Sequence, residues 1–245
     1  MSAHGPRKPR EAETTSAPAT GLLTKLKAVP SATNEDGFFS SLYLFDRAFG
    51  LRPLAGLDEA GRGPLAGPLV AACVILPEDF DHKLIDDSKK LKAETLKQAF
   101  DLITSKAINW SYALRTPKEV DELNPLWASM SAMGELLESF QPRPALALVD
   151  GNKLPISQVK LKAVVHGDAK SLSIAAASII AKVIRDQLMD EEHARYPQYG
   201  FNKHKGYGTK EHLETLARYG PSPIHRLTFR HVRPNETGPV GPRLF

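Results

Sequence analysis

The sequence contains a single cysteine, Cys73, among its 245 residues. One cysteine cannot form a disulfide within the chain, so a small disulfide-stapled scaffold is excluded and a reducing compartment is favoured. Long apolar runs are also missing, because the longest mostly apolar stretch, residues 65–76, is too short to cross a bilayer and contains Gly67 and Pro68. The N-terminus has no compact apolar secretion signal. We therefore expect a cytoplasmic protein without membrane contact.

The chain also lacks a large excess of either charge. Its 32 Lys and Arg residues face 28 Asp and Glu residues, which gives a net charge of +4. The distribution of these charges is more informative than their sum. From residue 201 onward the chain has eight positive residues and three negative ones, whereas the acidic residues singled out below lie upstream. This separation suits a protein that holds metal in one part and phosphates in another.

No internal repeat is visible, and both ends of the chain are poor in periodic apolar residues. Residues 1–36 are rich in Pro, Ala, Ser and Thr, which predicts a disordered tail. A mitochondrial presequence is the alternative, although Glu11 and Glu13 argue against it. Residues 233–245 resemble a second tail. Residues 37–232 are then expected to form one folded domain with a helical C-terminal part.

Five apolar segments have the length of strands, and helical spacing appears between and after them. The expected strands are residues 54–58, 69–76, 108–114, 145–149 and 161–165; the third alternates apolar and polar residues, and the last two suit strands covered on both faces. Expected helices cover residues 96–103, a segment beginning at Pro125 behind an Asn124 cap, and residues 171–196 and 209–220. Early strands followed by alternating helix and strand predict an α/β domain with a mixed sheet.

Carboxylates follow three of the expected strands. They are Asp58 and Glu59, Asp150, and Asp168. Strand ends are where α/β proteins place their sites, and oxygen ligands without histidine or cysteine suit Mg²⁺ or Mn²⁺. Each acid taken alone is better explained as part of a polar turn or as a partner of a helix N-terminus. Their recurrence at strand ends favours a metal site, but spacing alone leaves both interpretations open.

Glycines are concentrated in residues 61–67. The segment has neither the Gly-Lys-Ser/Thr ending of a phosphate loop nor the spacing of the dinucleotide fingerprint. It could let a sugar–phosphate strand approach the backbone, with Arg62 as a cationic guide. A tight turn with positive φ angles is the simpler explanation from glycine content alone.

Two further segments combine positive charge with features that nucleic acids contact. Lys89 and Lys90 precede a helix, where they could receive a phosphate or form an ordinary solvated helix start. Residues 204–208 place Tyr207 between glycines and beside lysines. Such a loop can stack a tyrosine on a sugar or base, and an ordinary surface loop is equally consistent with it.

Taken in order, these motifs resemble ribonuclease HII. The resemblance begins with Asp-Glu-Ala-Gly-Arg-Gly-Pro-Leu at 58–65 and extends from about residue 54 to 229. It continues through the segments at 87–91, 150–152, 167–168, 175–182, 199–207 and 225–226. Several motifs in the family's order are far more specific than any one of them.

The resemblance implies a ribonuclease H-like fold, a mixed five-stranded sheet flanked by helices. It implies a monomeric endonuclease that cuts the RNA strand of RNA–DNA hybrids and incises 5′ of single ribonucleotides in duplex DNA, as in ribonucleotide excision repair. Two divalent ions, Mg²⁺ or Mn²⁺, would give 3′-hydroxyl and 5′-phosphate ends. The implied roles are metal binding and catalysis by Asp58, Glu59, Asp150 and Asp168, reading of the ribose 2′-hydroxyl by Gly61, Arg62, Gly63 and Tyr207, and a phosphate contact by Lys89. His166 stands where members often carry lysine.

Other functions are consistent with parts of the sequence. A junction resolvase or a ribonuclease HIII would share the acids, but the latter carries a sizeable N-terminal domain for which residues 1–36 look too short. The presence of all four acids argues against a duplex-binding protein without catalysis. The missing phosphate-loop lysine argues against nucleotide hydrolysis. The last residues, Arg243, Leu244 and Phe245, faintly resemble sliding-clamp-binding peptides but lack their glutamine, so an incidental chain end is favoured.

Overall fold

The computed structural model describes residues 39–233, which lie within one unit of the chain, residues 33–245. Five strands of this part form a mixed sheet in the order β3-β2-β1-β4-β5. They are β1 (Leu54–Ala60), β2 (Leu69–Ile75), β3 (Asn109–Arg115), β4 (Leu146–Asp150) and β5 (Leu161–Val164). The β1–β2 and β2–β3 pairs are antiparallel, and the β1–β4 and β4–β5 pairs are parallel. The expected α/β class and mixed sheet are confirmed, and the expected tails lie outside the described residues except for Arg233.

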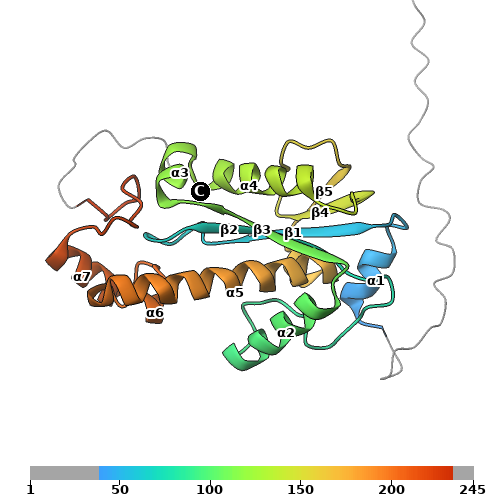
Figure 1. Ribbon diagram of the computed structural model, residues 1–245, viewed down its shortest axis with the longest axis horizontal. Coiled ribbons are helices and arrows are strands. Elements are labelled where there is room, and N and C mark those ends of the chain that lie inside the picture. Colours follow the sequence, from blue (N-terminus) through green and yellow to red (C-terminus); the bar gives the residue numbers. More distant parts are fainter. Residues whose placement is uncertain (1–38, 234–245) are drawn as a thin grey trace, which may run out of the picture. The chain divides into compact units, whose positions relative to one another are not determined.

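Helices cover both faces of this sheet (Figure 1). One face packs against α5 (Leu172–Arg195) and α2 (Ala93–Lys106), and the other against α4 (Pro125–Ser139), which is preceded by α3 (Pro117–Leu123). Alternate residues of β2 enter the two layers, since Val70, Ala72 and Val74 face α5 while Ala71, Cys73 and Ile75 pack with α4. Burial on both faces explains why β2 is an unbroken apolar run.

The helix boundaries follow the capping residues. The Asn124 side chain accepts hydrogen bonds from the N–H groups of Leu126 and Trp127, with Pro125 as the first helical residue of α4. Thr209 caps α7 (Lys210–Tyr219) in the same way. Two helices of seven residues were not expected, α1 (Ser41–Arg47) and α3, nor was the shorter helix at residues 201–204. Seven residues leave too little apolar periodicity to be recognised in a sequence.

Two expectations about burial are wrong in detail. In β3 the alternating apolar residues do not all face the core: Tyr112 and Leu114 are exposed, and Ala113 and Arg115 are buried instead. The strand lies at the sheet edge. The face that carries its even-numbered residues is covered only near Trp110, whose ring contacts the ring of Phe100 in α2. At the other edge, β5 is not covered on both faces and exposes Lys162.

The C-terminal part packs against the far end of α5. It includes α6 (Phe201–His204) and α7, whose Phe201 and Leu216 form an apolar cluster with Met189 of α5 and Ala66. Ala66 belongs to the glycine-rich segment that follows β1. The cluster therefore brings residues 61–68 and 199–232 side by side. Within the described range, no helix combines the length and apolar character needed to span a membrane.

Candidate active site

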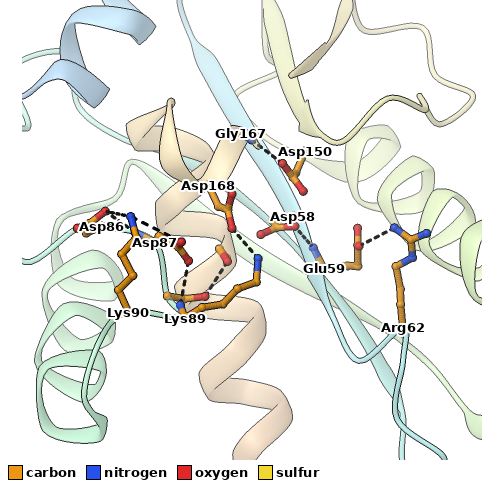
Figure 2. Close-up of polar contacts among 12 residues, drawn as sticks. Asp58, Glu59, Arg62, Asp86, Asp87, Lys89, Lys90, Asp150, Gly167 and Asp168 are labelled. Atoms are coloured by element: carbon orange, nitrogen blue, oxygen red, sulfur yellow. Dashed lines mark hydrogen bonds and ion pairs between the residues drawn. The ribbon is translucent and has the colours of Figure 1, made fainter. Parts of the chain in front are cut away.

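The four predicted acids lie at the carboxyl ends of the parallel strands (Figure 2). Asp58 and Glu59 occupy the end of β1, Asp150 ends β4, and Asp168 lies in the short 3₁₀ helix η1 (Gly167–Ala169) that follows β5. Because β1, β4 and β5 are parallel, their carboxyl ends meet at the same edge. The start of α5 is close to β1 as well, since a Cβ on Gly56 would lie 2.1 Å from the carbonyl carbon of Ser173. We call Asp58, Glu59, Asp150 and Asp168 the acid cluster.

Asp58 is buried, with 5% of its surface exposed, the same fraction as for Asp168. Burial raises its pKa well above the ordinary value, and the negative charges of Glu59 and Asp150 raise it further. The pKa of Glu59 is also raised by burial, against the opposing effect of Arg62. A divalent cation would offset both the lost hydration and the mutual repulsion of these carboxylates.

Each acid of the cluster has a partner from the protein, which for Asp58 Oδ1 is the Glu59 N–H at 2.7 Å. Lys89 Nζ lies 2.8 Å from Asp168 Oδ2, Arg62 Nη1 lies 3.3 Å from Glu59 Oε1, and the Gly167 N–H donates to Asp150 Oδ1 at 2.6 Å (Figure 2). With these partners in place, no three Asp, Glu, His or Cys side chains in residues 39–233 converge as ready metal ligands. The donor set is nonetheless all oxygen, which fits Mg²⁺ or Mn²⁺. Lys89 and Arg62 are exposed cations that can move away from the acids.

The predicted ribose-reading residues adjoin this cluster. We call residues 61–68 the recognition loop. A Cβ on Gly63 would lie 3.8 Å from Tyr207 Cε1, and the Leu65 N–H donates to the Gly206 carbonyl at 2.8 Å. Half of the Tyr207 surface is exposed, and Arg62 extends from the recognition loop to Glu59. The structure thus brings Gly63 and Tyr207 together although 144 positions separate them in the sequence.

Several residues near the recognition loop were missed by sequence reasoning. Arg185 and Arg226 are buried and donate to carbonyl groups of the recognition loop, and His212 and His225 are buried behind Tyr207. Arg226 lies within a motif of the resemblance, but nothing in one sequence distinguishes a buried arginine from an exposed one. His166 is exposed and has left-handed backbone angles ahead of Asp168.

Comparison with known proteins agrees with this geometry. The family model described as Ribonuclease HII matches residues 55–232. Ribonuclease HII of Caldanaerobacter subterraneus subsp. tengcongensis is 49% identical over 180 residues, 74% of this chain and 75% of that protein. Among solved structures, ribonuclease H2 of Pyrococcus horikoshii OT3 aligns with a TM-score of 0.62 and 30% identity over 73% of this chain and 94% of the other.

A second solved structure adds a protein partner to the comparison. Ribonuclease HII of Archaeoglobus fulgidus, in a complex with PCNA, has a TM-score of 0.59 and 25% identity over 72% of this chain and 95% of that one. The fold is therefore ribonuclease H-like. The chain belongs to the ribonuclease HII family, metal-dependent endoribonucleases that cut the RNA strand of RNA–DNA hybrids and leave 5′-phosphate ends.

Proposed function

We propose that the chain incises duplex DNA on the 5′ side of single embedded ribonucleotides, in addition to cutting longer hybrids, and serves ribonucleotide removal from DNA. The observation that carries this proposal is the packing of Gly63 against Tyr207, in a loop whose Arg62 reaches Glu59 of the acid cluster. A glycine lets the backbone approach a sugar, and a half-exposed tyrosine ring can cover the same sugar. The enzyme would then recognise a single ribose directly beside the phosphodiester bond that it cuts.

The acid cluster would hold two divalent ions, Mg²⁺ or Mn²⁺, through Asp58, Glu59, Asp150 and Asp168. Such ions, when bound, supply the Lewis acid that activates water and stabilises a leaving 3′-oxygen, which gives 3′-hydroxyl and 5′-phosphate ends. The carboxylates need only orient them. Lys89 and Arg62, now paired with Asp168 and Glu59, are the cations nearest to the acids and become available to phosphate oxygens once the acids have other partners.

Discrimination rests on polar groups that a ribose satisfies and a deoxyribose does not. Tyr207 lies against Gly63, so a ribose bound beside both would bring its 2′-hydroxyl within reach of the backbone of residues 61–63 and of the Tyr207 side chain. A deoxyribose would leave these groups unpaired, and such a loss is a strong way to reject a substrate.

The test uses a labelled DNA duplex with one ribonucleotide and an all-DNA duplex as control, in Mg²⁺, in Mn²⁺ and in EDTA. We expect metal-dependent cutting only 5′ of the ribonucleotide. Cutting of long hybrids alone would contradict the proposed role of residues 61–63 and Tyr207. Binding without any cutting would instead indicate an inactive duplex binder.

The contribution of Tyr207 can be divided between its ring and its hydroxyl. Tyr207→Phe keeps the ring, so we expect it to weaken cleavage at the ribonucleotide much less than Tyr207→Ala. Equal losses would show that the hydroxyl, and not stacking, carries the role.

We also propose that residues 37–232 are the catalytic domain and that it acts as a monomer. A fragment 37–232 should then retain cleavage and elute as one chain in size-exclusion chromatography. A weak sliding-clamp contact through Arg243, Leu244 and Phe245, outside the described residues, is proposed by analogy with the Archaeoglobus complex. Clamp capture that persists after deletion of Leu244 and Phe245 would exclude this tail as the contact.

A further inference from the structure

The carbonyl groups of the recognition loop are held by two buried arginines. Arg226 donates from Nη2 to Gly61 O at 2.6 Å, from Nη1 to Arg62 O at 3.1 Å, and from Nε and Nη2 to Gly67 O. Arg185 donates from Nε to Pro68 O at 3.1 Å and from Nη2 to Ala66 O at 3.2 Å. Five carbonyls of this one loop therefore accept hydrogen bonds from two guanidinium groups.

These arginines are unusual because they are buried as charges without a direct ion pair in the described residues, and Asp186 and Asp121 act on them only from a longer distance. Arg226 is fully buried and Arg185 is 2% exposed, and within residues 39–233 neither forms an ion pair with an Asp or Glu. Burial lowers the pKa of both, that of Arg226 to about 9, and for Arg226 the charge of Arg185 adds to the effect. Burying two like charges is expensive for a protein, so apolar residues would serve better if only packing were required.

The hydrogen bonds determine which backbone groups of the recognition loop remain available. Its carbonyls turn toward the arginines, while the N–H groups of Leu65 and Gly67 donate to Gly206 O and Ile224 O. In the described part of the chain, no acceptor faces the N–H groups of Arg62 and Gly63. Together with the N–H groups of Gly61 and Ala66, they are the backbone donors of the loop left for a sugar or phosphate, and Gly63 lies against Tyr207.

One of the two arginines, Arg185, also reaches the segment that carries Tyr207. Arg185 Nη2 also donates to Lys205 O at 2.9 Å, and its guanidinium carbon lies 5.9 Å from the centre of the Tyr207 ring. A Cβ on Gly206 would lie 2.4 Å from Ala66 O, so this glycine is needed for the close approach of the two segments. Arg185 thus connects the recognition loop to Tyr207 through the backbone.

We propose that Arg185 and Arg226 are positioning residues, a guanidinium clamp that fixes the recognition loop and Tyr207 as one preformed ribose-reading surface. The proposal rests on the proposed function, in which residues 61–63 and Tyr207 recognise the 2′-hydroxyl. The planar, five-donor fork of arginine suits this task, because it can hold several carbonyls in fixed directions and a lysine cannot.

The test compares affinities for a duplex with one ribonucleotide and for the all-DNA duplex, with Ca²⁺ in place of Mg²⁺ and the duplexes checked for cleavage. Arg226→Lys keeps the charge but loses the fork. We expect the preference of the variant for the ribonucleotide to fall by at least about tenfold, with all-DNA affinity changed less than about twofold. Circular dichroism and thermal unfolding report whether the variant is folded.

Arg52→Gln is the matched control, because Arg52 also donates to backbone carbonyls, those of Leu51 and Asp46, but at the opposite end of β1. It should leave the preference unchanged. Arg185→Lys is the second clamp variant and should act like Arg226→Lys. If Arg226→Lys folds and keeps the full preference for the ribonucleotide duplex, the clamp proposal is wrong. It is also wrong if both clamp variants unfold, because the arginines would then serve the fold alone. A native protein without any preference would instead contradict the proposed function.

Discussion

The two halves of the site are held in place by contacts of different kinds. In the acid cluster, the partners of Asp168 and Glu59 are Lys89 and Arg62, whose side chains are 78% and 49% exposed. In the recognition loop, the partners are buried guanidinium groups and backbone carbonyls. Exposed ion pairs contribute little and exchange readily, whereas the loss of a buried hydrogen bond leaves an unsatisfied polar group.

This difference corresponds to the two tasks. In the proposed function, the acid cluster must give its carboxylates to metal ions, so weak protein partners would be an advantage there. The recognition loop would gain selectivity for a sugar from groups whose directions are fixed before the substrate arrives. The following predictions test that contrast, beginning with the largest expected effect.

Asp58→Asn should abolish cleavage, by at least about 1,000-fold, because the amide is a poorer ligand for a hard cation. The same change should raise the free energy of unfolding in EDTA by about 1 kcal/mol, since it removes a carboxylate that burial and its neighbours disfavour. Single-turnover cleavage and urea unfolding measure the two effects. Asp46→Asn, another buried aspartate near the start of α5, should stay active. A loss of both activity and stability in Asp58→Asn would mean that Asp58 is structural.

Gly206→Ala and Gly151→Ala compare the two halves directly. Both glycines have positive φ, +84° and +92°, but a Cβ would meet Ala66 O at position 206 and open space at 151. We expect Gly206→Ala to lower the free energy of unfolding by about 3 kcal/mol and Gly151→Ala by about 1 kcal/mol. Chemical denaturation measures both. Equal losses would show that backbone strain matters and that the packing of the two loops does not.

The histidines behind Tyr207 predict a loss of stability in acid. A backbone N–H can only donate, so His225 Nδ1 accepts from Ser222, and the neutral ring can then donate from Nε2 to His212 Nε2 at 3.0 Å. Burial lowers the pKa of His225 to about 4, and the charge of His212 adds to this effect. The unfolded chain, with an ordinary histidine pKa near 6.5, binds the proton first. The stabilisation from keeping His225 neutral is complete above about pH 6.5 and decreases as the pH falls toward 4, by about 3 kcal/mol.

His225→Gln isolates this effect, since the free energy of unfolding of the variant should depend less on pH between 6.5 and 4. The comparison with the native protein is required because Asp58 and Glu59, whose pKa values are raised, change stability in the opposite direction. Parallel curves for the two proteins would contradict the prediction.

The smallest effect is expected at Lys89, which in the proposed function would compete with a metal ion for Asp168. Lys89→Ala should tighten Mn²⁺ binding by about threefold, because an exposed lysine is screened by solvent and contributes little. Isothermal titration calorimetry without nucleic acid measures this without reference to activity. Lys90→Ala, whose partners Asp86 and Asp87 lie outside the acid cluster, is the control. Unchanged binding in Lys89→Ala would show that the ion pair does not compete.

Local patterns in the sequence predict much of the fold. Period-two and unbroken apolar runs mark all five strands, and Asn124, Thr209 and Gly220 mark helix ends through hydrogen bonds that involve neighbouring residues only. The same patterns predict burial less well at the sheet edges. Tyr112 is exposed because no helix covers that part of β3. The sequence of a strand does not show which other elements will pack on it.

The sequence by itself determines the types of residue at the candidate site: four carboxylates at or after strand ends, a glycine-rich loop, and a tyrosine between glycines. Only the tertiary structure decides which of them meet and what holds them. It pairs Lys89 with Asp168, brings Gly63 against Tyr207, and buries Arg185 and Arg226 beneath the recognition loop. The physical reason is that caps and strands depend on nearby residues, whereas these contacts join segments far apart in the chain whose approach depends on the packing of the whole domain.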